Sequence, residues 1–141
     1  MKAMARRRVS GDYGKTRLFF RFHWHESRRF SRTNAWSAPW NSDEEYELRR
    51  GYSCFDDPIS LAEYFEDRNQ VTRASAQLVI FEGVDVGVGD DNEDLAMPLL
   101  ASEGFRAYLD PAELATIIDL WDAANTRDAA EDAIVAWIVG Q

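Results

Sequence analysis

The chain contains very little cysteine, since Cys54 is the only one in 141 residues. A single cysteine excludes an internal disulfide and is typical of a reducing compartment, so we expect a cytoplasmic protein. It has no C-x-x-C partner, which argues against a thiolate metal site. No apolar run approaches the ~20 residues that a membrane-spanning helix needs. The basic start, residues 1–15, lacks the apolar stretch of a secretory signal.

Common nucleotide-binding and hydrolytic motifs are also missing. Gly83, Gly87 and Gly89 give the spacing G-x-x-x-G-x-G, but no Lys-Ser/Thr pair follows and no helix is expected to begin there. This excludes a P-loop and a dinucleotide fingerprint. The G-x-S-x-G turn of serine hydrolases does not occur either.

Metal-binding patterns are equally scarce. The acidic residues between positions 85 and 94 lack the spacing and the closing Glu of an EF-hand. His23 and His25 are the only histidines, and Glu26 is the only other candidate ligand near them. We therefore expect no metal, and we interpret the acidic segment as a solvated turn.

Charge is abundant but unevenly distributed. Residues 1–50 hold 12 Lys/Arg and 6 Asp/Glu, whereas residues 51–141 hold 4 and 19. With a pI near 4.7, the chain lacks the clustered cations that neutralise phosphates, so duplex DNA binding is not expected. The acidic second part either keeps the protein soluble or contacts a basic partner such as a host or cognate protein.

The apolar pattern predicts strands in the first two thirds of the chain. Residues 16–24 alternate, with Leu18, Phe20 and Phe22 on one face and Arg17, Phe19, Arg21 and His23 on the other. The continuous apolar run at 76–82 predicts a central strand, which continues to residue 89 as a glycine-interrupted strand or bulge. Shorter strands are expected at 51–55 and at 95–100, where Pro98 favours an edge or a strand end.

Helices are predicted where capping residues precede apolar periodicity. Asp57-Pro58 and Asp110-Pro111 begin two of them, and a third is expected from about residue 126 to 139. A short helix is also predicted at 42–50. Strands first and a helix pair last favour an α+β fold, with a small mixed or antiparallel sheet. We expect a flexible basic arm at 1–15 and a single globular domain at 16–141.

Three segments together carry a resemblance to a known family. They are the strand with His23, the segment Gly51-Tyr52-Ser53-Cys54-Phe55 with the helix after it, and Asn92-Glu93-Asp94-Leu95 after the central strand. Over residues 16–98 this order resembles the ADP-ribosyltransferase fold, in the branch whose site is built from a His, a Tyr and a Glu. The resemblance implies an NAD-dependent transferase of the effector or toxin type, which moves ADP-ribose to a macromolecular target.

The resemblance also implies roles for individual residues. His23 would bind the nicotinamide ribose hydroxyls, Tyr52 would stack on the nicotinamide ring, and Ser53 would bond its amide. Glu93 would be the catalytic carboxylate on the ribose 2′-OH. Cleaving the nicotinamide–ribose bond builds positive charge on the sugar, which a nearby carboxylate stabilises.

Arg17 and Arg21 share the strand face of His23 and would pair with the pyrophosphate of NAD. An alternative from a different class remains open: a non-catalytic acidic interaction module, such as an inhibitor, an antitoxin or a nucleic-acid mimic. Each of the three residues also has a purely structural interpretation: His23 as a strand-surface histidine, Tyr52 as a core aromatic and Glu93 as part of a charged turn.

Overall fold

The computed structural model describes residues 15–37, 51–66 and 71–141. It is an α+β fold with a curled antiparallel sheet of five strands. The strands are β1 (Thr16–Trp24), β2 (Tyr52–Cys54), β3 (Ala76–Val88), β4 (Asp94–Pro98) and β5 (Arg106–Leu109). The helices are α1 (Pro58–Phe65), α2 (Leu114–Ala123) and α3 (Arg127–Val139), with 3-10 turns at Thr33–Ser37 and Pro111–Glu113.

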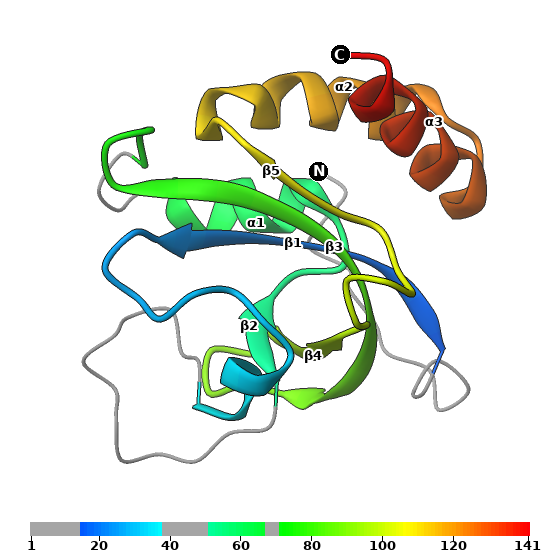
Figure 1. Cartoon of the computed structure of the whole chain (residues 1–141). Coiled ribbons are helices and arrows are strands. Elements are labelled where there is room, and N and C mark those ends of the chain that lie inside the picture. The colour runs from blue at the N-terminus through cyan, green and yellow to red at the C-terminus, as the bar shows by residue number, and fades with distance from the viewer. Residues whose placement is uncertain (1–14, 38–50, 67–70) are drawn as a thin grey trace.

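The long strand β3 organises the sheet. Its first part pairs with β1 and with β5, and its second part pairs with β4, which in turn pairs with β2. The register shifts between Asp85 and Gly87, so the bulge predicted in the glycine-rich part of this strand is confirmed. The sheet then curls until Phe55 bridges back to Phe20 of β1. Figure 1 shows β2 and β4 below β1 and the two carboxyl-terminal helices above.

The alternation predicted for β1 separates two cores. Leu18, Phe20 and Phe22 pack with Leu78 and Ile80 of β3 against the three helices. On the inner face of the curl, Phe19 packs in a second cluster with members of β2, β3 and β4. Arg21 and His23 lie on this inner side too, because they alternate with the helix-facing residues. The inner face therefore holds both apolar and polar side chains.

The capping signals predicted at Asp57 and Asp110 are confirmed, and Thr126, which was not predicted as a cap, caps the third helix. The side chains of Asp57, Asp110 and Thr126 accept hydrogen bonds from backbone N–H groups of the first turn. The predicted helix at 42–50 lies outside the described residues. The sequence did not predict β5, whose four residues have no long apolar run.

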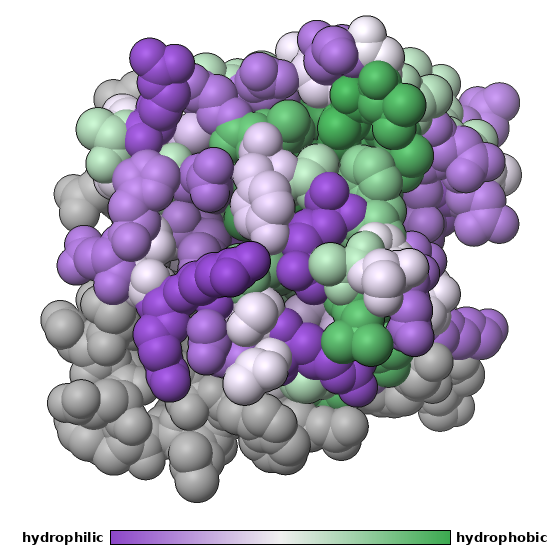
Figure 2. Space-filling model, in the orientation of Figure 1, coloured by the Kyte–Doolittle hydropathy of each residue, from purple (hydrophilic) through white to green (hydrophobic). Residues whose placement is uncertain are grey.

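The described surface in Figure 2 is mostly hydrophilic, and apolar side chains gather mainly toward the carboxyl-terminal helices. No helix among residues 15–37, 51–66 and 71–141 is long and apolar enough to cross a membrane.

Helix α3 completes the outer edge of β1 with two side chains. Glu131 Oε2 accepts a hydrogen bond from the backbone N–H of Leu18 at 3.1 Å, and Arg127 Nη2 donates to the Leu18 carbonyl at 3.1 Å. The two side chains also pair with each other at 2.9 Å. Backbone groups of Phe20 are satisfied by Phe55 at 2.8 and 3.0 Å. The outward backbone groups of Leu18 and Phe20 are therefore satisfied without a further strand.

We expect Glu131→Ala to destabilise the fold by about 1–2 kcal/mol, because the Leu18 N–H loses a charged acceptor in a part-buried position. Thermal or urea unfolding measures the change. The matched control is Asp132→Ala, which removes an exposed carboxylate from the next position of the same helix. Equal losses in the two variants would contradict the bridging role.

Candidate functional site

A buried polar cluster lies inside the curl of the sheet, and its members come from distant parts of the chain. Arg21 of β1 donates from Nη1 to the Ser53 carbonyl of β2 at 2.8 Å. The Ser53 hydroxyl donates to Glu93 Oε2, next to β4, at 2.8 Å. Arg21 Nε also donates to His23 Nδ1 at 3.1 Å. The cluster formed by Arg21, His23, Ser53 and Glu93 is called the inner cluster below.

The turn between β3 and β4 aims Glu93 inward. Asn92 adopts φ = 64°, a left-handed conformation that Asn tolerates better than most residues. The Gly89 N–H donates to the Glu93 carbonyl at 2.8 Å and closes the hairpin. A Cβ on Gly89 would come within 2.2 Å of Glu93 Oε2, so a side chain at this position would displace the carboxylate. The Asp91 N–H holds the other oxygen, Oε1, at 2.9 Å.

Glu93 is therefore not a solvent-facing member of the acidic turn. Only 1% of the residue is exposed, whereas its neighbours Asp90, Asp91 and Asn92 are exposed. The alternative of a solvated charged turn is wrong for Glu93 and correct for those three neighbours. A buried carboxylate with donors on both oxygens is held in one orientation.

Arg21 is the cation of the inner cluster and is completely buried. Desolvation lowers its pKa to about 10, while the negative charge of Glu93 is among the influences that raise it. The guanidinium therefore remains charged at neutral pH. Its Cζ also lies 4.8 Å from the centroid of the Tyr52 ring, a cation–π contact. Burying this cation is tolerated because acceptors and a ring surround it.

His23 is held in one tautomer by its two partners. Nδ1 accepts from Arg21, so the proton is on Nε2, which donates to the Arg28 carbonyl at 2.8 Å. Its pKa is lowered to about 4, first by desolvation and then by the charge of Arg21. With 8% exposure, His23 is not the strand-surface histidine of the alternative interpretation. It is neutral at pH 7 and fully hydrogen-bonded.

Tyr52 belongs to the aromatic core on the inner face. Its ring stacks on Phe30 at 4.3 Å with 14° between the planes, and Arg21 lies over the ring. Its hydroxyl donates to the Ser31 carbonyl and accepts from the Ser31 N–H. Phe30 and Arg21, both in the described part of the chain, cover the ring, so a nicotinamide could stack there only after displacing Phe30.

Arg17 does not join the inner cluster. It pairs with Asp56 at 2.7 Å, in a network that also includes Arg127 and Glu131. It shares the inner strand face, with its Cζ 5.8 Å from the Phe19 ring, but it lies at the opposite end of the strand from His23. Of the two arginines expected at a pyrophosphate, only Arg21 reaches the cluster.

The interpretation of the acidic segment as a solvated turn is wrong for two further carboxylates, Asp85 and Asp94, which are buried. Asp85 is 2% exposed and Asp94 is 1% exposed. Asp94 Oδ2 accepts from the Asp56 N–H at 2.9 Å, and its charge helps burial to raise the pKa of the Cys54 thiol. Alternation along β3 places Asp85 on the same face as the buried Val79 and Phe81. The two-residue period of the strand could therefore have predicted that Asp85 is buried.

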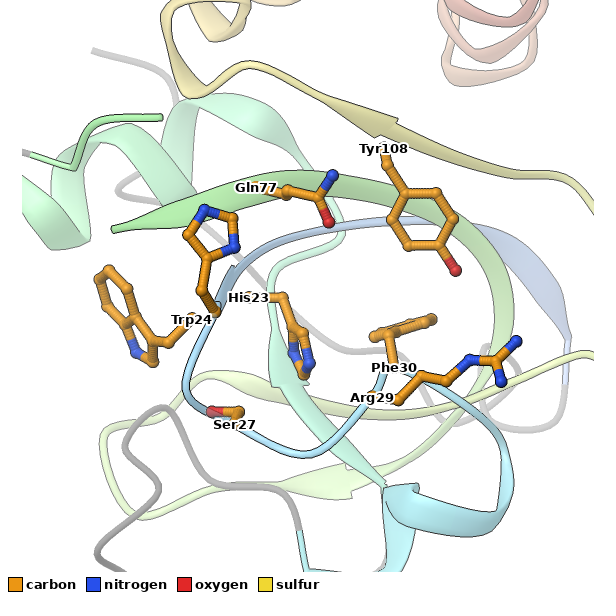
Figure 3. Close-up of a pocket in the computed structure, with 8 residues that line it drawn as sticks. His23, Trp24, Ser27, Arg29, Phe30, Gln77 and Tyr108 are labelled. Carbon is orange, nitrogen blue, oxygen red and sulfur yellow. The ribbon is translucent and has the colours of Figure 1, made fainter. Parts of the chain in front are cut away.

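A cavity of about 390 Å³ lies beside the inner cluster, at the far end of β1. Figure 3 shows His23 and Phe30 on one side of it and Gln77 and Tyr108 on the other. His23 and Phe30 both contact the Tyr52 ring. They therefore separate this cavity from the rest of the inner cluster.

Neither metal ligation nor comparison with known proteins assigns the site. Within residues 15–37, 51–66 and 71–141 there is no group of three or more His, Cys, Asp or Glu side chains that could hold a metal ion. No family model, no curated protein and no solved structure matches the chain.

Stability should depend on pH through His23. An unfolded histidine binds its proton near pH 6.5, and folded His23 binds it near pH 4. Between these values the unfolded state holds more protons, so the free energy of unfolding falls as the pH drops. This group contributes at most about 1.4 kcal/mol per pH unit in that window.

Urea unfolding at pH 7, 6, 5 and 4 measures this dependence. His23→Gln removes the titrating group and should flatten the curve, even though the variant is less stable at pH 7. His25→Gln removes an exposed histidine nearby and should keep the slope. If the His23→Gln curve is as steep as that of the wild type, the titration belongs to another group.

Proposed function

We propose that this chain is an NAD-dependent ADP-ribosyltransferase in which Glu93 is the catalytic carboxylate. The observation that supports the proposal is the convergence of Arg21, Ser53 and Glu93 through hydrogen bonds of 2.8 Å. The three residues come from segments that are separated by tens of positions in the sequence. A guanidinium, a hydroxyl and a carboxylate on one inner surface suit a substrate with a pyrophosphate and a ribose.

The reaction breaks the bond between the nicotinamide nitrogen and C1′ of the ribose. Nicotinamide leaves with the electron pair of that bond, positive charge develops on the sugar, and a nucleophile of the target then bonds to C1′. Glu93 would stabilise the developing charge. Its two oxygens are already oriented by the Ser53 hydroxyl and the Asp91 N–H. In a buried site such a fixed charge acts more strongly than it would in water.

The remaining residues take supporting roles in this proposal. Arg21 positions Ser53 through its carbonyl and offers a cation for the pyrophosphate. Tyr52 accepts the nicotinamide ring once Phe30 moves aside, because Phe30 now occupies one face of the ring. His23 would leave the Arg28 carbonyl to bond the ribose hydroxyls. Substrate binding therefore includes a rearrangement of the loop that carries Phe30.

A second candidate function rests on a different observation. Arg21, Tyr52, Ser53 and Glu93 are each at most 1% exposed, and their polar groups bond one another or nearby backbone. A saturated polar core of this kind also occurs as a purely structural element. The chain would then be a non-catalytic interaction module that uses its acidic outer surface.

The test is Glu93→Gln in an assay of nicotinamide release from NAD. We expect the wild-type protein to release nicotinamide and the variant to lose at least about 100-fold in rate, because an electrostatic contact to the developing charge is removed. The matched control is Glu103→Gln, the same change at an exposed position, which should keep the wild-type rate.

Glu93→Gln also loses one hydrogen-bond acceptor, so both variants are assayed well below their unfolding midpoints. Thermal shift with NAD provides a second measurement, since a ligand at 100 times its dissociation constant adds about 2.7 kcal/mol of stability. If a folded wild-type protein neither releases nicotinamide nor shifts with NAD, the transferase proposal fails and the interaction module remains.

A further inference from the structure

The cavity at the far end of β1 differs from the inner cluster in its use of polar groups. Inside the curl, the side chains of the inner cluster bond one another or nearby backbone. Among the residues that line the cavity, His23 and His25 bond backbone carbonyls, but the Ser27 hydroxyl is buried and has no hydrogen-bond partner among the described residues. A buried hydroxyl without a partner costs free energy, which a ligand atom in the cavity would recover once the Ser27 side chain rotates toward it.

The charge of the cavity lining is opposite to that of the whole chain. The net charge of the protein is −9, yet the described residues around the cavity include no carboxylate. Arg29 supplies a permanent positive charge there, and its exposed guanidinium makes no ion pair within the described part of the chain. The cavity therefore favours an anionic group.

Ring surfaces make up much of the remaining wall. Trp24, Phe30 and Tyr108 contribute aromatic rings, and Tyr108 is 44% exposed. Figure 3 shows the Tyr108 ring above Phe30. The Arg29 side chain extends beside Phe30, also below the Tyr108 ring in this view. Gln77 points its amide toward the same space, where it can pair with the edge of a heterocycle. A planar ring that carries an anion matches this combination.

We propose that this cavity binds a small planar heterocycle with an anionic group, the chemistry of a nucleoside monophosphate. The ring packs against Tyr108, the phosphate pairs with Arg29, and Gln77 and Ser27 bond polar atoms of the base or sugar. A volume of about 390 Å³ is sufficient for such a ligand. Phe30 and His23 separate it from Ser53 and Glu93, so the inference does not depend on the transferase proposal.

The experiment is calorimetric titration of the full chain with AMP. Arg29→Gln should weaken binding about tenfold or more, because a charge-assisted contact to phosphate is lost. Arg28→Gln is the matched control: Arg28 is the neighbouring exposed arginine, its side chain does not line the cavity, and its backbone bond to His23 is retained. We expect the control to change affinity less than about threefold.

Two further measurements separate the parts of the ligand. Adenosine should bind about tenfold or more weakly than AMP, since it lacks the anion, and inorganic phosphate alone should not compete at equal concentration. Ser27→Ala should weaken AMP binding without lowering the unfolding midpoint, because the hydroxyl has no partner in the described protein to lose.

The proposal is overturned if AMP does not bind the wild-type protein, if it binds no better than adenosine, or if Arg28→Gln and Arg29→Gln have equal effects. Glu93→Gln should bind AMP as the wild type does. AMP binding without nicotinamide release would reject the transferase proposal alone, whereas nicotinamide release without AMP binding in this cavity would reject the present inference alone.

Discussion

The burial of the Arg21 guanidinium is the constraint on which the inner half of the structure depends. A cation without solvent is costly unless acceptors and rings replace water around it. Arg21 finds them in the Ser53 carbonyl, the His23 imidazole and the Tyr52 ring. These contacts connect β1 to β2, in addition to the packing of Phe19 in one cluster with Tyr52 and the bridge between Phe20 and Phe55. The curl of the sheet and the charge at its centre therefore stabilise each other.

The curl of the sheet separates two polar regions, the inner cluster and the cavity at the far end of β1, that differ in burial. The inner cluster is almost fully buried and holds Glu93 in one orientation through the Ser53 hydroxyl and the Asp91 N–H. The same region places Phe30 over Tyr52, so one face of the Tyr52 ring is covered. The cavity beyond Phe30 is lined by Arg29, Gln77 and three aromatic rings, with no carboxylate among the described residues around it. Phe30 is common to both regions, because it covers Tyr52 on the inner side and lines the cavity on the other.

Much of the secondary structure could be predicted from local sequence. The alternation of residues 16–24 gave the correct faces, and two helix starts followed from Asp57 and Asp110 as capping residues. The strand β5 was not predicted because its four residues form a strand by pairing with Leu78–Phe81. That pairing is not indicated by any local sequence pattern. The transferase resemblance in the sequence also groups His23, Tyr52, Ser53 and Glu93, and these residues lie in one region of the structure. Their common role in chemistry remains a proposal.

The sequence by itself determined the α+β class, the two faces of β1 and the positions of two helix caps, because period and capping act over a few residues. Only the tertiary structure decided which charges are buried. Asp90, Asp91 and Glu93 all carry a carboxylate, yet of these three only the Glu93 side chain points into the inner cluster. The left-handed conformation of Asn92 and the close approach of Gly89 set the direction of that side chain. Arg17 and Arg21 share a strand face, yet Asp56 holds one and the inner cluster holds the other. Burial of a charge depends on partners brought from distant segments, and that information is not local.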